Sequence, residues 1–198
     1  MCGRYQFSTE SQELSQIERA ARRRAGAPLD KLNFLCSDIS PTSSAPVLIA
    51  DGIRVVADIQ RWGIPGWNGR LIINARAETV CEKPMFRCNI VGQRCAIPAS
   101  GYYEWDRSRH KYFFSLPGQP IYFAGIYNSI EETNCFVILT TKPNESVKQI
   151  HNRMPLILLH DQVRPWLTDP VEALTLLALD PPPLQRICAD GQISLFEN

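Results

Sequence analysis

The chain has 198 residues, of which 44% are hydrophobic and 21% charged, as is ordinary for a globular domain. A formal net charge of +1 argues against nonspecific coating of nucleic acid, although 21 Lys and Arg residues can still gather in one groove. No run of roughly 18 apolar residues predicts a membrane span, and nothing resembles a signal peptide. We expect one domain over residues 1–198, without a membrane partner.

The seven cysteines predict reduced thiols, because an odd number without an export signal is typical of a cytosol-like compartment. Cys81, Cys88 and Cys95 recur every seven residues, which does not match the C-x-x-C spacing of zinc sites. We expect these three side chains to be small buried hydrophobes. We predict no metal and no cofactor.

The first predicted element is a helix. Thr9 and Gln12 are spaced as a capping box, and the arginines at 22–24 before Gly26 are typical of a helix C-terminus. This arginine run could contact nucleic acid, but a solvated helix end explains it better.

A loop and a hairpin are expected next. Residues 30–45 are rich in proline and serine, which predicts a loop. Asp51-Gly52 between apolar runs predicts a hairpin turn joining residues 47–50 to residues 53–62. The segment 62–67 then contains two tryptophans, which either fill the core or stack against bases. The core interpretation is slightly favoured.

The rest of the chain predicts short strands punctuated by Gly or Pro, a pattern typical of a sheet that curls or closes. We therefore expect an α+β fold, a single domain with a mixed or antiparallel barrel-like β core and peripheral short helices. The strands are expected at 71–78, 93–98, 101–105, 111–116, 121–127, 135–141 and 154–159, short helices at 83–91 and 145–150, and a helical pair around 162–179.

Cys2 follows the initiator methionine, and its small side chain favours removal of Met1. Cys2 would then hold an α-amine and a thiol on adjacent carbons. Such a 1,2-aminothiol condenses with an aldehyde to a Schiff base and closes a thiazolidine ring. The amine titrates at about 7.7–8.0 and the thiol near 8.5, and we expect Arg4 to lower the thiol pKa. Taken alone, a cysteine at this position needs no function.

Polar residues also interrupt the predicted strands. Asn74, Arg76 and Glu78 alternate and are expected on one strand face. Glu104 lies between aromatic residues, which should desolvate it and raise its pKa toward that of a working acid or base. His151 is expected between a helix and a strand. Each residue taken singly has an ordinary structural explanation.

Together these motifs resemble the SRAP family, the SOS-response-associated peptidase-like proteins, over roughly residues 2–170. The resemblance implies a protein that caps abasic sites in single-stranded DNA covalently through its N-terminal cysteine, and that removes its own leading residues. It also implies a cytoplasmic or, in a eukaryote, nuclear location, and we expect a monomer. The motifs are Met-Cys-Gly-Arg at 1–4, Ser-Pro-Thr at 40–42, Trp-Gly-Ile-Pro-Gly-Trp at 62–67, Ile-Asn-Ala-Arg-Ala-Glu-Thr at 73–79, Gly-Tyr-Tyr-Glu-Trp at 101–105 and Ile-His-Asn-Arg-Met-Pro at 150–155.

The resemblance also implies catalytic roles. Cys2 is the nucleophile, and Asn74 holds the α-amine or the sugar. Glu104 shuttles protons, while His151 acts on the deoxyribose oxygen and assists reversal. Arginines would grip phosphates, and the tryptophan and loop residues would stack against or wedge the bases. The residues expected to contact DNA are Arg4, Pro41, Thr42, Trp67, Arg76 and Arg153.

Three features depart from the usual family pattern. Asp38 stands in the segment before Ser-Pro-Thr where an asparagine is usual, and a carboxylate there disfavours phosphate. The wedge loop has one tryptophan, Trp67, in place of two. The sequence given stops at Asn198, short of a C-terminal strand segment that many members have.

Two other functions remain open. An N-terminal-nucleophile amidase or peptidase would use Cys2 with Asn74 as an oxyanion donor, and it would leave no covalent band with abasic DNA. A single-strand binding module without chemistry would keep its binding after Cys2→Ala and show no preference for abasic sites.

Overall fold

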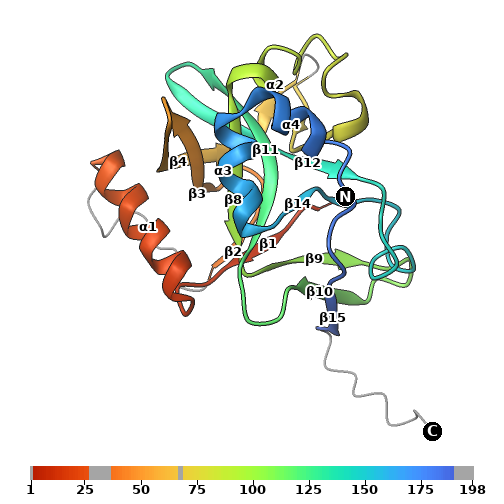
Figure 1. Ribbon diagram of the computed structural model, residues 1–198. Helices are drawn as coiled ribbons and strands as arrows, with labels where there is room; N and C mark the ends of the chain where they lie inside the picture. Colours follow the sequence, from red (N-terminus) through yellow and green to blue (C-terminus); the bar gives the residue numbers. More distant parts are fainter. Residues whose placement is uncertain (1, 27–36, 67–68, 190–198) are drawn as a thin grey trace, which may run out of the picture.

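The computed structural model describes residues 2–26, 37–66 and 69–189, and five of its strands close into a barrel (Figure 1). Around the barrel the order is β12, β4, β3, β8 and β11, and β11 pairs again with β12. The pairs are antiparallel except β4–β12, which is parallel. This confirms the expected α+β fold with a barrel-like core. The barrel strands are β3 (Ser44–Asp51), β4 (Arg54–Trp62), β8 (Arg94–Ala99), β11 (Ile121–Ile130) and β12 (Thr133–Thr141).

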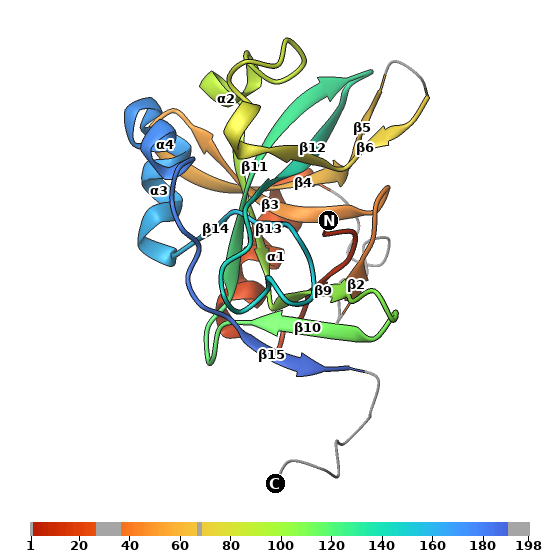
Figure 2. The same ribbon diagram turned by 90° about the vertical axis from the view of Figure 1, so that its right-hand side faces the viewer.

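A second sheet lies against one end of the barrel, and all of its pairings are antiparallel. Figure 2 shows the dark red N-terminal segment running between this sheet and the barrel strands. Cys2, near the start of this segment, is completely buried. In order across the sheet, the strands are β15 (Gln185–Cys188), β10 (Lys111–Ser115), β9 (Gly101–Trp105), β1 (Tyr5–Phe7) and β2 (Ser37–Ile39).

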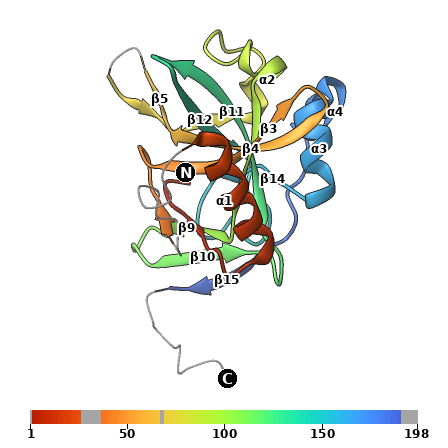
Figure 3. The ribbon, with the colours of Figure 1, turned by 90° about the vertical axis from the view of Figure 1, so that its left-hand side faces the viewer.

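The remaining elements are short, as predicted for the periphery. Helix α1 packs against β3 and β4, and α3 packs against β8 and β11 (Figure 3). No helix within the described ranges combines the length and the apolar character that a membrane crossing requires. These elements are α1 (Gln12–Ala25), α2 (Asn89–Gly92), α3 (His160–Thr168), α4 (Pro170–Leu176), the 3₁₀ turn η1 (Ala77–Thr79), and the strands β5 (Ile64–Pro65), β6 (Leu71–Ile72), β7 (Asn74–Arg76), β13 (Met154–Pro155) and β14 (Ile157–Leu158).

Alternation along the strands builds two apolar layers, because successive side chains point to opposite faces. Ile97 and Phe123 lie in the same buried cluster as Cys2. Their neighbours Ala96 and Ala124 belong to a second cluster, which includes Trp166 of α3. Cys2 is therefore part of the main core and not of the surface.

Helix α1 begins two residues later than the capping box predicted. Ser11, not Thr9, is the N-cap, and its hydroxyl accepts a hydrogen bond from the Leu14 amide at 3.4 Å. The C-terminus at Gly26 is confirmed, with a left-handed φ of 60° that glycine tolerates. In the arginine run, Arg22 is buried against Glu18 and so is not a solvated residue.

Several predicted elements differ in type or extent. The segments 83–91 and 145–150 form separate hydrogen-bonded turns, with helix only in the four residues of α2. Segments this short gain too few hydrogen bonds to offset helix nucleation. The expected strand 71–78 divides into β6, β7 and η1. The expected loop 30–45 contains β2 and the start of β3, while its residues 30–36 lie outside the described part.

Other differences are local. The hairpin is confirmed, but Asp51 pairs with Arg54, so the turn residues are Gly52 and Ile53. Strand β15 was not predicted, because its pairing with β10 is distant in sequence. Among the cysteines spaced by seven, Cys95 is buried as expected, whereas Cys81 and Cys88 are exposed.

Candidate functional site

Cys2 lies three residues before the start of β1 and is completely buried. Antiparallel pairing sets Tyr5 opposite Tyr102, and the Tyr103 amide donates to the Arg4 carbonyl at 3.0 Å. Continuing this register places the start of the chain beside the Glu104 end of β9. The Cys2 thiol itself faces the Arg4 carbonyl oxygen at an S–O distance of 3.8 Å.

The environment of Cys2 favours the protonated thiol. Burial raises its pKa far above the usual value, and the nearby charge of Glu104 raises it further. Arg4 does lower the thiol pKa, but through the hydrogen bond of its backbone carbonyl and not through its charge, and burial outweighs this effect, so the net shift is upward. The Arg4 guanidinium is partly exposed and lies 3.9 Å from Asp38, while the carbonyl of the same residue is what contacts the thiol.

Asn74 connects β7 to the N-terminal segment. Its Nδ2 donates a hydrogen bond to the Cys2 carbonyl at 2.9 Å. Its Oδ1 is buried and has no hydrogen-bond partner among the residues that the structure describes. Because a buried acceptor without a donor is costly, this oxygen is suited to a group that arrives later. Parallel pairing of Asn74 with Ile138 of β12 fixes its position in the sheet.

Glu104 is 3% exposed, and burial raises the pKa of its carboxyl, as the flanking aromatic residues predicted. The charge of His151 acts in the opposite direction and lowers that pKa, so the two groups are electrostatically linked. A carboxyl with a raised pKa retains its proton closer to neutrality, which is the condition for a general acid.

His151 is half-buried and follows the turns of residues 144–150. Its Nδ1 accepts a hydrogen bond from the Arg153 amide at 3.1 Å, and the Arg153 carbonyl lies at the same distance from this nitrogen. A neutral ring that accepts at Nδ1 has its proton on Nε2. In its protonated form the ring carries a proton on both nitrogens and can donate one through Nε2.

The three arginines expected at phosphates have different surroundings. Arg76 and Arg4 are exposed. Arg153 instead forms a two-point ion pair with Glu78, and its side chain is 14% exposed. Of the three, Arg76 and Arg4 are the guanidinium groups most open to a ligand.

Asp38, the departure from the family pattern, is accompanied by two cations. Its Oδ2 lies 3.9 Å from Arg4 Nη1 and 4.0 Å from Lys111 Nζ. At such exposure these are weak interactions. Asp38 therefore offsets part of the positive charge that Arg4 and Lys111 would otherwise present.

The predicted base-contacting loop contains a strained residue. Thr42 is exposed with a φ of 76°, an uncommon conformation for a β-branched residue. Its amide donates to the Trp62 carbonyl at 2.8 Å, which holds the loop on β4. Trp62 is fully buried and confirms the core interpretation, whereas Trp67 lies outside the described residues.

Replacing Thr42 by glycine should raise the free energy of unfolding by about 1 kcal/mol, because relief of a left-handed β-branched residue outweighs the added unfolded-state entropy. Urea unfolding measures this change. The matched control Thr9→Gly, at a residue without positive φ, should lower the stability. A lower free energy of unfolding for Thr42→Gly than for wild type would contradict the claim that Thr42 is strained.

Two tyrosines near Cys2 were not predicted as site residues. Tyr5 and Tyr102 are fully buried, and neither hydroxyl has a hydrogen-bond partner among the described residues. Burial raises the pKa of both, and Cys2 is the next contributor in each case. The available signal was their position: Tyr5 directly follows the Met-Cys-Gly-Arg motif, and Tyr102 lies within Gly-Tyr-Tyr-Glu-Trp.

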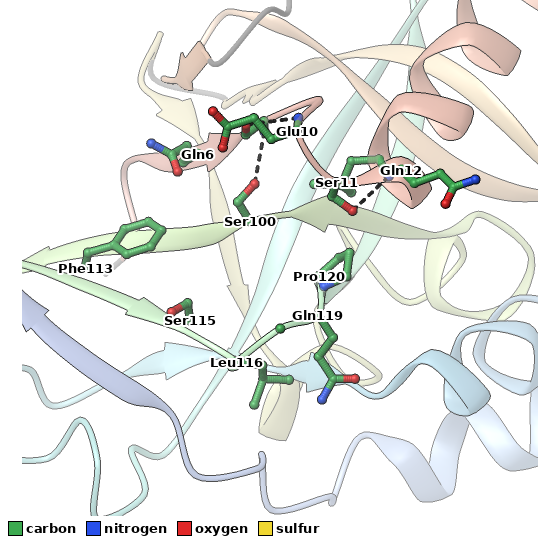
Figure 4. A pocket seen from close by; sticks show the side chains of 13 residues that line it. Gln6, Glu10, Ser11, Gln12, Ser100, Phe113, Ser115, Leu116, Gln119 and Pro120 are labelled. Atoms are coloured by element: carbon green, nitrogen blue, oxygen red, sulfur yellow. Dashed lines mark hydrogen bonds between the residues drawn. The ribbon is translucent and has the colours of Figure 1, made fainter.

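A polar cavity of about 440 Å³ lies apart from these residues, near the start of α1 and the β10–β11 connection (Figure 4). None of the four predicted catalytic residues lines it. In the described ranges no group of three His, Cys, Asp or Glu side chains is arranged to hold a metal ion. The cavity is lined by Gln6, Ser8, Glu10, Ser11, Gln12, Leu14, Ser100, Phe113, Ser115, Leu116, Gly118, Gln119 and Pro120.

Solved structures share this fold. A protein from Bacteroides thetaiotaomicron superposes with a TM-score of 0.74 at 23% identity, covering 94% of this chain and 91% of the other. A protein from Bordetella bronchiseptica gives a TM-score of 0.73 at 24% identity, covering 94% and 99%. At such identities the likeness concerns the fold alone.

Proteins with similar sequences identify the family of this chain. The abasic site processing protein YoaM of Bacillus subtilis is 39% identical over 146 residues, which cover 66% of this chain and 64% of YoaM. The abasic site processing protein YedK of Escherichia coli is 28% identical over 178 residues, covering 84% and 79%. The chain thus spans just under two thirds of the length of YoaM. The model of the family described as SOS response associated peptidase (SRAP) matches residues 1–187. The chain belongs to this family.

Proposed function

We propose that this chain processes abasic sites by forming a thiazolidine crosslink between Cys2 and the ring-opened aldehyde in single-stranded DNA. The observation that carries the proposal is the grouping of four residues from separate segments. Asn74 holds the Cys2 carbonyl at 2.9 Å, the charge of Glu104 raises the pKa of Cys2, and the charge of His151 lowers the pKa of Glu104. The names of YoaM and YedK support the substrate.

The proposed chemistry begins with removal of Met1, which the same cysteine assists and which frees the α-amine. The protonated His151 ring donates a proton to the sugar ring oxygen as the C1′–O bond breaks, and the hydroxyl on C1′ becomes the aldehyde as its proton passes to His151. The amine adds to the aldehyde, and Asn74 Oδ1 accepts a hydrogen bond from that amine. Glu104 then donates a proton to the departing hydroxyl, and water leaves.

Glu104, which has just lost its proton, acts as the base in ring closure. The Cys2 thiol starts protonated, since burial raises its pKa. The Glu104 carboxylate accepts the thiol proton while sulfur bonds to the iminium carbon. The sum is aldehyde plus aminothiol giving thiazolidine and one water. Glu104 returns to its acid form, as a catalyst must.

The intact mass of the protein, before and after mixing with an abasic single-stranded oligonucleotide, tests the proposal. The adduct should weigh the Met1-free protein plus the DNA minus one water. It should survive heating in denaturant, as a covalent bond does. An N-terminal-nucleophile amidase or a plain binding module would leave both masses unchanged, and that result would remove the proposed function.

The DNA is expected to lie over the exposed arginines, and the protein to act as a monomer in the cytosol or nucleus. Arg76→Ala should weaken binding of single-stranded DNA and reduce the slope of log K against log salt by roughly 0.7, one phosphate contact. Filter binding over a salt series measures the slope. The exposed Arg23 on α1 provides the control, and Arg23→Ala should leave the salt slope unchanged. An equal slope for wild type and Arg76→Ala would exclude this contact.

A further inference from the structure

We propose that Glu78 is a positioning residue that fixes the His151 imidazole through Arg153. The inference deepens the proposed function and rests on it. Glu78 lies in η1, directly after the strand β7 that contributes Asn74. It thus belongs to one half of the site, while Arg153 and His151 belong to the other.

The two halves are joined by a strong contact. Arg153 Nη1 donates to Glu78 Oε1 at 2.6 Å, and Nη2 donates to Oε2 at 2.8 Å. Such two-point guanidinium–carboxylate pairs fix orientation as well as distance. The Arg153 hydrogen bonds lower the pKa of Glu78, so its carboxyl remains ionised at neutral pH.

A second contact fixes the same guanidinium to the barrel. Arg153 Nη2 also donates to the Thr140 carbonyl. Thr140 is completely buried in β12 and pairs with Arg76 of β7 on one side and with Pro155 of β13 on the other. The guanidinium therefore bridges β12 and η1, and the position of residue 153 is set relative to Asn74.

The backbone of Arg153 in turn sets the His151 ring. Its amide donates to Nδ1 when the ring is neutral, and its carbonyl, at 3.1 Å, can accept from Nδ1 when the ring is protonated. One residue therefore serves both protonation states of His151. If residue 153 moves, the direction of Nε2 changes with it.

This arrangement favours positioning over phosphate binding as the role of the pair. Both terminal nitrogens of Arg153 already donate to Glu78, and a phosphate would have to displace a carboxylate from a mostly buried side chain. A phosphate would have to compete with both hydrogen bonds of a two-point pair, which is stronger than a single contact. The two roles give opposite expectations for DNA affinity once Glu78 loses its charge.

Single-turnover crosslinking at saturating abasic single-stranded DNA tests the inference with a double-mutant cycle. Glu78→Gln should slow crosslinking about tenfold or more, because small displacements of a reacting group cost this much. Its affinity for undamaged single-stranded DNA should stay within about twofold of wild type. In a His151→Gln background, Glu78→Gln should cause no further slowing, since coupled residues are not additive.

The controls separate the outcomes. Glu82→Gln, an exposed neighbour, should crosslink like wild type, and Glu78→Asp, which keeps the charge, should recover part of the rate. If Glu78→Gln does not fold, Glu78→Asp takes its place in the cycle. Three results would each overturn the positioning role. They are a wild-type crosslinking rate in the Glu78 variants, equal slowing by Glu78→Gln in the wild-type and His151→Gln backgrounds, and tighter DNA binding by Glu78→Gln. Absence of any adduct with the wild type would instead reject the proposed function.

Discussion

An uncleavable extension ahead of Cys2 should abolish crosslinking to abasic single-stranded DNA. An acylated nitrogen cannot attack an aldehyde, so neither the Schiff base nor the thiazolidine can form. The site is also enclosed, since Cys2 is completely buried between the barrel and the second sheet. Denaturing gels with a labelled abasic oligonucleotide measure the adduct, and we expect none from the extended protein.

The matched control is the same extension with a protease site that ends directly before Cys2. Cleavage should restore the adduct, which shows that the extended protein was folded. Cys2→Ser separates the two functional groups further, because its amine can still form an imine that borohydride traps, whereas no stable ring follows. Full crosslinking by the extended protein would end the aminothiol mechanism.

Glu104→Gln should slow crosslinking by about 10²-fold or more, the usual scale of general acid–base catalysis. Loss of water from the carbinolamine needs a proton donor, and closure of the ring needs an acceptor for the thiol proton. Burial raises the pKa of Glu104, so the wild-type residue can serve as that donor near neutrality. Glutamine keeps the size and hydrogen bonding but exchanges no proton.

Rapid-quench measurement at saturating DNA gives this rate, and binding of a non-reactive abasic analogue gives the affinity. The analogue should bind the variant and wild type alike, because Glu104 acts on the reaction and not on the phosphates. Glu10→Gln, at an exposed carboxylate outside the catalytic group, is the control for loss of charge alone. A Glu104→Gln protein that crosslinks at the wild-type rate would exclude Glu104 from the mechanism.

Burial of Cys2 adds a consequence that its sequence position did not indicate. A thiol with a raised pKa is a poor nucleophile and resists oxidation, because the thiolate is the reactive form. In the proposed mechanism the thiol need not ionise in advance. It loses its proton to Glu104 after the iminium has formed on the same residue, so reactivity is confined to the productive complex.

The sequence by itself determined the features that depend on near neighbours. Alternation and turn residues identified the hairpin of β3 and β4 and the strands β8 to β12, which together include all five barrel strands, because a strand's side-chain period is local. The aromatic neighbours of Glu104 indicated the direction of its pKa shift for the same reason. The chemistry open to Cys2 also follows from its position alone.

The tertiary structure decided what depends on distant segments. Closure of the barrel by parallel β4 and β12 and the pairing of β15 with β10 join strands far apart in sequence. The pKa of Cys2 is raised and not lowered as expected, because desolvation by the whole core exceeds the effect of the adjacent Arg4. Glu78 and Arg153 likewise meet through the register of β7, β12 and β13, since contacts between strands are set by pairing and not by spacing along the chain.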